Sequence, residues 1–352
     1  MTLRWSDWPP QVLGALRRGV AIPAHPLALN AQRQFDARRQ RALSRYYLEA
    51  GAGGLAVGVH TTQFAIREEG LYRPVLELAM QTATESGRMP VMIAGLVGRT
   101  AQAVSEAQTA RGIGYHAGLL SVAAMRGAGE DELIAHCEAV AREIPLVGFY
   151  LQPAVGGILL PVSFWRRFAQ IENVVGIKIA PFNRYRTLEV VRGVIEAGAT
   201  ERVTLYTGND DHIVGDLLTP LRLVVNGRET TIRIRGGLLG HWSVWAKRAV
   251  ELLDRIHAAI ATEQIPADLL ALDAQVTDCN AAIFDVANDF RGVIAGCHEI
   301  LRRQGLLEGT WCLDPHESWG PGQKEEIDRV CAAYPHLNDD AFVRQNLERW
   351  LA

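Results

Sequence analysis

The chain has 352 residues, with 36 lysines and arginines against 39 aspartates and glutamates and a formal net charge of −3. With this near balance the protein has no net positive charge to attract nucleic acid or an anionic membrane surface, so we expect neither as a partner. Hydrophobic residues make up 48% of the chain and charged residues 21%, which excludes a disordered protein. No apolar run reaches the roughly 18–20 residues that a membrane-spanning helix needs.

The five cysteines are scattered and odd in number, and no two of them form a CxxC pair. Such a set favours neither a disulfide framework nor structural zinc. The N-terminal segment MTLRWSDWPPQVLGALRRGV lacks the apolar core of a secretion signal. Together these features predict a reduced, cytoplasmic protein, and we expect no cofactor.

Short apolar runs rich in Val, Ile, Leu and Gly recur along the first 240 residues, each followed by a gap long enough for a crossover helix. The runs are nearly all apolar rather than alternating, as in strands that are covered on both faces. Eight such units predict an α/β fold of the (β/α)₈ barrel type. The runs are residues 19–25, 54–60, 90–96, 114–121, 145–150, 174–180, 203–208 and 231–237.

The gaps hold helical patterns such as FDARRQRALSRYYLEAG and TAQAVSEAQTARG, which end at Gly51 and Gly112. LRLVVNGRETTIRI departs from this rhythm and predicts a hairpin with Asn226-Gly227 as its two-residue turn. We therefore expect a barrel over residues 1–240 with a hairpin insertion near 221–234. A C-terminal helical region is expected over 241–352.

One lysine lies inside an apolar run. Lys178 is flanked by isoleucines in VVGIKIA, near the carboxyl end of a predicted strand, where the active sites of such barrels lie. Burying an ammonium there costs several kcal/mol unless it is paired or loses its proton. An amine with a lowered pKa can form a Schiff base with a carbonyl. The alternative is a structural lysine that pairs with a neighbouring carboxylate.

The choice of cations in this chain favours amine chemistry. There are 33 arginines and only three lysines, and Lys247 and Lys324 lie in helical, solvent-compatible sequence. Because arginine cannot lose its proton, it cannot replace an amine nucleophile. Lys178 is therefore the candidate nucleophile.

Several runs together resemble one known family. ENVVGIKIA is similar to the Schiff-base strand of the dihydrodipicolinate synthase and N-acetylneuraminate lyase superfamily. PLVGFYLQPAVGG resembles its tyrosine segment, and GGLAVGVHTTQF resembles its Gly-Thr-Thr-Gly-Glu strand. Tyr150 and Lys178 lie 28 positions apart on successive runs, as in that family. Further matches are IPAHPLAL, PVMIAGL, YTGNDD, RIRGGLL and the late PGQKEEIDRV.

The resemblance implies a class I aldolase or dehydratase that acts on a 2-oxo acid. Lys178 would form the imine, and Tyr150 would be the acid/base hydroxyl. Thr61 would relay protons to that tyrosine, and Thr61 with Thr62 would hold the substrate carboxylate. The resemblance also implies a homo-oligomer, either a tetramer or a dimer.

Other strand-end residues are expected to bind the rest of a small-molecule substrate. The expected set is His60, His25, Gly208, Asn209, Ile232 and Gly236. With Asp210 and Asp211 nearby, these polar groups favour a polyhydroxylated or sugar-derived 2-oxo acid.

Departures from the family pattern argue against a true dihydrodipicolinate synthase. SVAAMRGAG stands where synthases carry Pro-Tyr-Tyr, so the tyrosine given across the subunit interface is absent. Val155 stands where an arginine usually binds a second carboxylate. The Gly-Thr-Thr-Gly-Glu motif is here His60-Thr61-Thr62-Gln63-Phe64.

Two other functions remain open from the sequence. The first is a non-catalytic barrel of the same family that only binds a ligand. The second is a metal-dependent barrel enzyme whose ligands include His25, His60 and His212, although the sequence shows no tight HxH or HExxH spacing and we expect no metal. His241, Asp210 and Asp211 could also belong to such a site.

Overall fold

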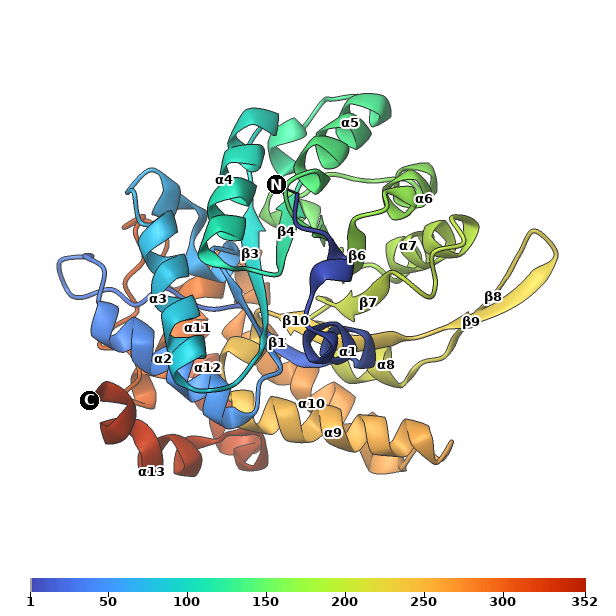
Figure 1. Cartoon of the computed structure of the whole chain (residues 1–352). Coiled ribbons are helices and arrows are strands. Elements are labelled where there is room, and N and C mark those ends of the chain that lie inside the picture. Colours follow the sequence, from blue (N-terminus) through green and yellow to red (C-terminus); the bar gives the residue numbers. More distant parts are fainter. Residues whose placement is uncertain (1) are drawn as a thin grey trace.

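The structure of the chain is a computed structural model that describes residues 2–352. Eight parallel strands form a sheet in the order β1-β10-β7-β6-β5-β4-β3-β2, and helices surround it (Figure 1). The sheet closes between β1 and β2, where the Ala24 and Ala56 backbones form a parallel bridge. The predicted (β/α)₈ barrel is thereby confirmed. The strands are β1 (Ala21–Pro23), β2 (Gly54–Val57), β3 (Val91–Leu96), β4 (Ala117–Ser121), β5 (Leu146–Leu151), β6 (Val174–Ala180), β7 (Thr204–Thr207) and β10 (Ile234–Leu239).

The barrel strands are followed by helices that cover their outer faces. A short helix, α1 (Pro10–Arg18), precedes β1, and its Val12 and Leu16 pack with residues of the barrel interior. The surrounding helices are α2 (Ala37–Ala50), α3 (Tyr72–Glu85), α4 (Thr100–Ile113), α5 (Glu130–Ala141), α6 (Val162–Gln170), α7 (Arg184–Glu196), α8 (Ile213–Leu218) and α9 (Ala246–Ala261).

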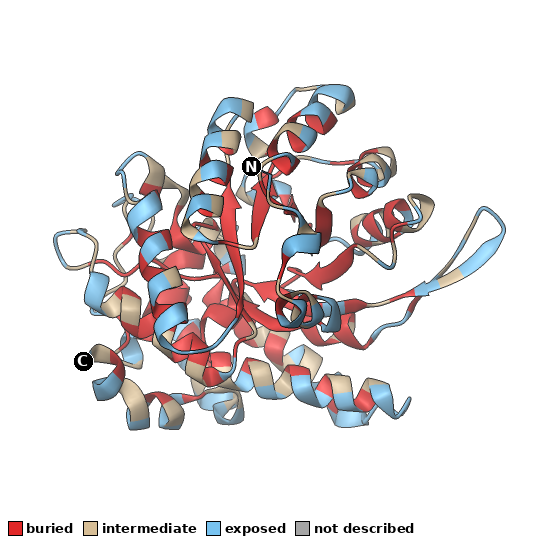
Figure 2. Ribbon diagram, in the orientation of Figure 1, coloured by how far each residue is buried: buried red, intermediate tan, exposed pale blue. Residues whose placement is uncertain are grey.

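The apolar strands are buried on both faces (Figure 2). Alternate residues of β5 show the two directions: Val147, Phe149 and Leu151 pack in the barrel interior, whereas Leu146 and Tyr150 pack under the helices. This alternation follows from the two-residue repeat of a strand. It decides which side chains can reach the barrel mouth.

Local signals explain where the helices begin and end. The Asp36 side chain accepts a hydrogen bond from the Arg39 amide at 3.0 Å and caps the start of α2. The same helix ends at Gly51 in the left-handed conformation, with φ of 100°, as the sequence predicts. Helix α4, in contrast, continues through Gly112 and ends at Gly114, with φ of 107°. The second glycine is the one that adopts the left-handed cap.

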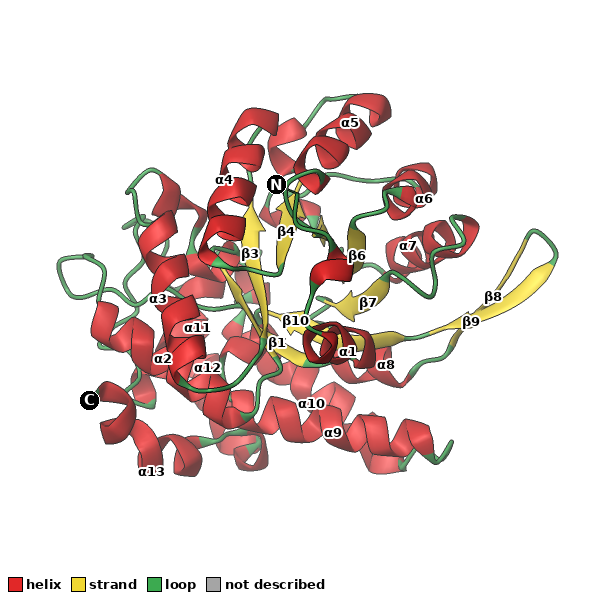
Figure 3. Ribbon diagram, viewed as in Figure 1, coloured by secondary structure: helices red, strands yellow, loops and turns green. Residues whose placement is uncertain are grey.

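A two-stranded antiparallel hairpin extends away from the barrel (Figure 3). Its strands are β8 (Leu221–Val225) and β9 (Arg228–Ile232), joined by Asn226 and Gly227 with φ of 50° and 75°. Two positive φ values are typical of the type I′ turn that the Asn-Gly pair favours. β10 begins only after this hairpin, at Ile234, and reaches the barrel mouth at Leu239.

The C-terminal helices pack onto the barrel helices and share their hydrophobic core. They are α10 (Ala267–Ile283), α11 (Val293–Arg303), α12 (Gln323–Ala333) and α13 (Asp340–Leu351). On α13, the Trp350 ring lies 5.5 Å from the Tyr46 ring of α2, centroid to centroid. Within residues 2–352, no helix has the length and apolar character needed to cross a membrane.

Candidate functional site

A small cavity of about 50 Å³ lies at the carboxyl ends of the barrel strands. Most of its wall is apolar, and its polar side chains come from β6, from the loops after β5 and β7 and from the turn after β2. This position is where barrel enzymes of this fold carry their chemistry. The lining residues are Ala24, Val59, His60, Thr61, Phe149, Leu151, Gln152, Val155, Lys178, Ala180, Phe182, Gly208, Asp210, Gly240, Phe284 and Val293.

Lys178 extends from β6 into this cavity. Its Nζ lies 4.4 Å from the centroid of the Phe149 ring on the neighbouring strand, and the residue is only 7% exposed. Burial lowers the pKa of the amine, and the negative charge of Asp210 partly opposes that shift. A Cβ on Gly208 would come within 2.6 Å of Lys178 Cε, so a glycine is needed beside the lysine. The site therefore holds an amine that gives up its proton more readily than an exposed lysine.

Asp210 lines the same cavity from the loop that follows β7. It is 4% exposed, and its Oδ1 accepts a hydrogen bond from the His241 amide at 2.8 Å. Burial raises the pKa of this carboxyl, while the His241 hydrogen bond and the Lys178 charge lower it in part. Among the described residues, Lys178 forms no ion pair at 4.0 Å or closer. The amine and the carboxyl thus share one cavity without direct contact.

A short 3₁₀ turn after β2, His60–Thr62, forms another part of the wall. The Thr61 hydroxyl donates to the Ala24 carbonyl at 2.7 Å, and the Thr62 hydroxyl donates to the His25 carbonyl at 2.6 Å. Burial and the nearby Lys178 charge lower the pKa of His60 to about 4. Near neutral pH, His60 is therefore an uncharged imidazole beside the amine.

The structure does not bring Tyr150 into the cavity with Lys178. Its ring packs against Trp165 of α6 at 5.1 Å, and its hydroxyl accepts a hydrogen bond from the Leu160 amide at 3.3 Å. The reason is the alternation along β5, which turns Phe149 inward and Tyr150 outward. The expected position of Tyr150 at the site, and its expected contact with Thr61, are corrected accordingly.

Five of the expected substrate-binding residues also lie outside the cavity wall. Thr62 is fully buried behind the turn, where its hydroxyl donates to the His25 carbonyl. His25 faces α2, where its Nε2 lies 2.8 Å from the Ser44 hydroxyl. The Asn209 amide donates to Asp216 at 2.9 Å and to Thr187 at 3.1 Å. Ile232 ends the hairpin, and Gly236 packs near Val20 towards the base of the barrel. The last two were misplaced because β10 begins after the hairpin and extends three residues beyond Gly236, to Leu239.

The histidines of the metal-dependent alternative do not come together. His25 faces α2, His60 lines the cavity, and His212 pairs with Asp273 of α10 at 3.0 Å. Among residues 2–352, no group of three or more His, Cys, Asp or Glu side chains could hold one metal ion.

Sequence reasoning missed the contribution of the C-terminal region to this site. Phe284, just after α10, and Val293, at the start of α11, both line the cavity. Phe182, after β6, also lines it and packs edge-on against Phe290 at 5.7 Å. No motif marks these residues, because their role depends on how the tail folds back over the barrel mouth.

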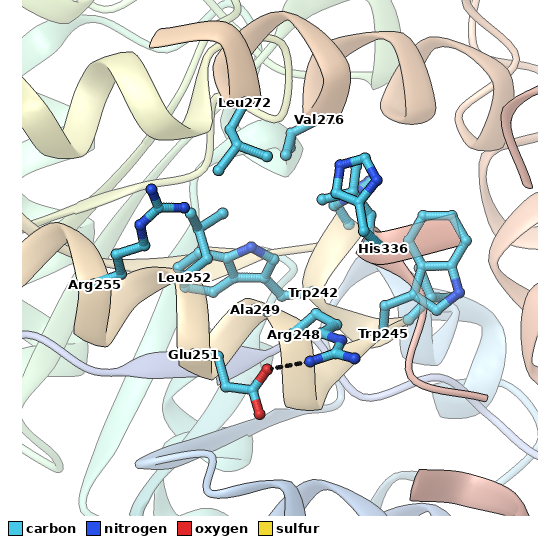
Figure 4. A pocket seen from close by; sticks show the side chains of 13 residues that line it. Trp242, Trp245, Arg248, Ala249, Glu251, Leu252, Arg255, Leu272, Val276 and His336 are labelled. Atoms are coloured by element: carbon cyan, nitrogen blue, oxygen red, sulfur yellow. Dashed lines mark hydrogen bonds and ion pairs between the residues drawn. The ribbon is translucent and has the colours of Figure 1, made fainter. Parts of the chain in front are cut away.

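A second cavity, of about 230 Å³, lies outside the barrel between α9 and α10 (Figure 4). Trp242 and Trp245 form much of its apolar wall, and Arg248 pairs with Glu251 at 2.7 Å. Of the described residues that line it, none is a lysine, and His241 is the one residue that the sequence suggests for a site. The smaller cavity with Lys178 is therefore the candidate active site.

Comparisons with known proteins place this geometry in a family context. A model of the dihydrodipicolinate synthetase family matches residues 19–220. The 4-hydroxy-tetrahydrodipicolinate synthase of Kosmotoga olearia is 29% identical over 168 residues, which are 47% of this chain and 56% of that protein. The probable 5-dehydro-4-deoxyglucarate dehydratase 2 of Streptomyces coelicolor is 29% identical over 172 residues, which are 47% of this chain and 51% of that protein. The matches thus span little more than half the length of these curated relatives.

The whole barrel also has counterparts among solved structures. The chloride-inhibited dihydrodipicolinate synthase from Acinetobacter baumannii, complexed with pyruvate, aligns with a TM-score of 0.73. The alignment covers 89% of this chain and 98% of that one at 18% identity. At that identity the likeness shows the fold alone.

Proposed function

This chain belongs to the dihydrodipicolinate synthetase family, and on that premise we propose that it is a lyase that joins Lys178 to a 2-oxo acid as a Schiff base. The observation that carries the proposal is the buried Lys178 amine, which lines a cavity at the barrel mouth and whose pKa burial lowers. An amine in that state attacks carbonyl carbon without first losing a tightly held proton.

The proposed chemistry begins with attack of Lys178 Nζ on the C2 carbonyl of the substrate. The carbinolamine then loses water to give a protonated imine, which withdraws electrons from C3. That electron sink serves either an aldol cleavage or the loss of a β-hydroxyl group. In this proposal the substrate carboxylate binds at the turn after β2, whose His60 and Thr61 line the cavity.

The composition of the cavity wall supports a substrate different from that of a dihydrodipicolinate synthase. Val155 lines the wall, so the described wall offers no arginine for a second carboxylate. The relative from Streptomyces coelicolor carries the name of a dehydratase that acts on a sugar acid. We therefore include sugar-derived 2-oxo acids among the substrates of the proposal.

Reductive trapping tests the imine directly. Purified protein is incubated with pyruvate and cyanoborohydride, and the peptide that holds Lys178 is measured by mass spectrometry. The expected result is one adduct, on Lys178, which is lost in Lys178→Arg. Lys247→Arg is the matched control, because Lys247 lies on α9, pairs with Glu251 at 3.7 Å and should leave the adduct unchanged. Absence of an adduct with pyruvate and with every sugar-derived 2-oxo acid tried would overturn the proposal.

One observation favours the alternative of a barrel that binds its ligand without turnover. Tyr150, the expected acid/base, faces α6 instead of the amine. A protein of that kind would form the adduct and yet catalyse no proton exchange on the bound substrate. The homo-oligomer expected from the resemblance stays a prediction.

A further inference from the structure

We infer that the Asp210 carboxylate performs the role expected of Tyr150, which faces α6, and moves the proton between C3 of the substrate and the enzyme. This inference rests on the proposed function, because it concerns the imine formed by Lys178. The inference places the catalytic acid/base in the loop after β7. The family resemblance places it on β5, on the other side of β6 and its lysine.

Imine chemistry needs a group that accepts and returns a proton close to the amine. Among the residues that line the described cavity, the titratable side chains are His60, Lys178 and Asp210. Lys178 is consumed in the imine itself. The choice therefore lies between an imidazole and a carboxylate.

His60 is a poor choice for this step. Burial and the Lys178 charge keep its imidazole uncharged near neutral pH, and its conjugate acid is too strong for it to remove a carbon-bound proton well. Thr61 is also unsuited, because its hydroxyl donates to the Ala24 carbonyl and has no ionised form near neutral pH. Both side chains lie on the turn that would hold the substrate carboxylate.

Asp210 meets the geometric requirements. Its carboxyl is buried in the cavity wall, and the His241 amide donates a hydrogen bond of 2.8 Å to Oδ1, which fixes the orientation of the carboxyl. Among described residues, Oδ2 accepts no hydrogen bond and so remains available to a substrate. Asp210 and Lys178 line the same cavity and form no ion pair at 4.0 Å or closer, so neither group is blocked by the other. Burial also raises the pKa of this carboxyl towards the working range of a general base.

The proton transfer balances without any other reactant. Asp210 Oδ2 takes a proton from C3 of the pyruvate imine, and the C3–H pair becomes the C2–C3 double bond. The C2–N double-bond pair moves to nitrogen, which leaves a neutral enamine beside a neutral carboxylic acid. The reverse step returns a proton to C3, which is a deuteron when Asp210 has exchanged with heavy water.

Exchange of the pyruvate methyl protons in D₂O tests the inference separately from imine formation. Proton NMR follows loss of the methyl signal, while cyanoborohydride trapping measures the Lys178 adduct in the same protein. We expect Asp210→Asn to keep the adduct and to lower exchange about 10²- to 10⁴-fold, the usual contribution of a positioned base. Asparagine retains an oxygen that can accept from the His241 amide, so the loop should stay in place.

Two further variants complete the design. Asp211→Asn changes the adjacent carboxyl, which is not part of the described cavity wall, and should exchange at the wild-type rate. Tyr150→Phe removes the outward hydroxyl and should do the same. Exchange that persists in Asp210→Asn, or that is lost only in Tyr150→Phe, would refute the inference while leaving the adduct intact. Loss of the adduct in a folded Asp210→Asn protein would also refute it, since Asp210 would then be required before the imine exists. Failure of the proposed function itself appears differently, as absence of an adduct in the wild-type protein.

Discussion

Lys178 combines three local conditions that make an amine reactive. It lies on a strand buried on both faces, it packs over Phe149, and Gly208 leaves space for its stem. Desolvation lowers the pKa of Lys178 and the Asp210 charge raises it, so the pKa of the amine depends on both effects. A single nearby carboxylate therefore affects both the charge state of the nucleophile and, on our inference, the fate of its product.

The lowered pKa of Lys178 gives a pH dependence with a definite sign. The neutral amine is the nucleophile, so the rate of adduct formation should rise with pH and level off below the ordinary lysine pKa of about 10.4. Because the Asp210 charge raises the Lys178 pKa, Asp210→Asn should move the midpoint to lower pH. Trapping rates with pyruvate across a pH series measure both midpoints. A midpoint at the ordinary lysine value in the wild-type protein would contradict this prediction.

Lys178, His60 and Thr61 line the cavity at the barrel mouth where the sequence predicts them, whereas Tyr150 does not. A charged residue inside an apolar run can be recognised without knowing which residues of the strand face inward, because both faces of such a strand are buried. Tyr150 is different, since a shift of one residue along β5 exchanges inward for outward positions. Spacing along the chain places Tyr150 on the correct strand and does not determine which face it occupies.

At the scale of elements, a buried ion pair holds the loop that follows the His60–Thr62 turn. Arg67, at the end of a second 3₁₀ turn (Phe64–Arg67), contacts both oxygens of Glu106 on α4 at 2.8 and 2.9 Å. The guanidinium also donates to the Gly58 and Gly95 carbonyls at 3.2 and 2.9 Å. The pair therefore ties β2, β3 and α4 together next to the candidate site.

Removing Arg67 should destabilise the protein because it leaves Glu106 buried without its partner. The two side chains are 10% and 8% exposed, so we expect Arg67→Ala to lower the free energy of unfolding by about 3–5 kcal/mol. Arg73→Ala is the matched control, since Arg73 and Glu77 pair at 3.0 Å with both side chains more than half exposed, and the loss there should be about 0–1 kcal/mol. Urea unfolding measures both. Equal losses in the two variants would show that burial does not strengthen the Arg67 contact.

Most elements follow from their sequence patterns, and the exceptions have local causes. Each predicted run contains a barrel strand or part of one, because apolar residues between helical patterns leave few other choices. The eighth predicted run joins the end of β9 to the start of β10. Both strand ends carry a β-branched residue, Ile232 and Ile234, and only Arg233 separates the two strands. Gly236 was therefore expected at the mouth, where Gly240 lies instead.

At the scale of the whole molecule, the C-terminal tail secures helix α2 and the segment after β10. Tyr46 donates to Asp339 at 2.7 Å and accepts from the Ala246 amide at 2.7 Å, while Tyr47 donates to the Ser243 carbonyl at 2.7 Å. Trp350 covers Tyr46 from outside and is fully buried. The tail thus adds hydrophobic cover to the barrel as well as the cavity wall formed by Phe284 and Val293.

Loss of the Trp350 ring should therefore destabilise the barrel and not only the last helix. We expect Trp350→Ala to lower the free energy of unfolding by about 3–5 kcal/mol, as for other buried aromatic residues. Tyr185→Ala, at a side chain that is 81% exposed, should change it by about 0.5 kcal/mol or less. Thermal and urea unfolding followed by circular dichroism compare the two. A loss below about 1 kcal/mol for Trp350→Ala would show that the Trp350 ring contributes little to barrel stability.

The junction between β1 and β2 links the folding of the barrel to the assembly of its site. β1 has only three residues, and one backbone bridge joins Ala24 to Ala56. The Thr61 and Thr62 hydroxyls cross this junction to carbonyls that follow β1. A chain in which β1 has not yet docked cannot hold that turn in its native form. Formation of the candidate site thus requires completion of the ring, and a ligand bound at the turn would favour the closed ring over an open one.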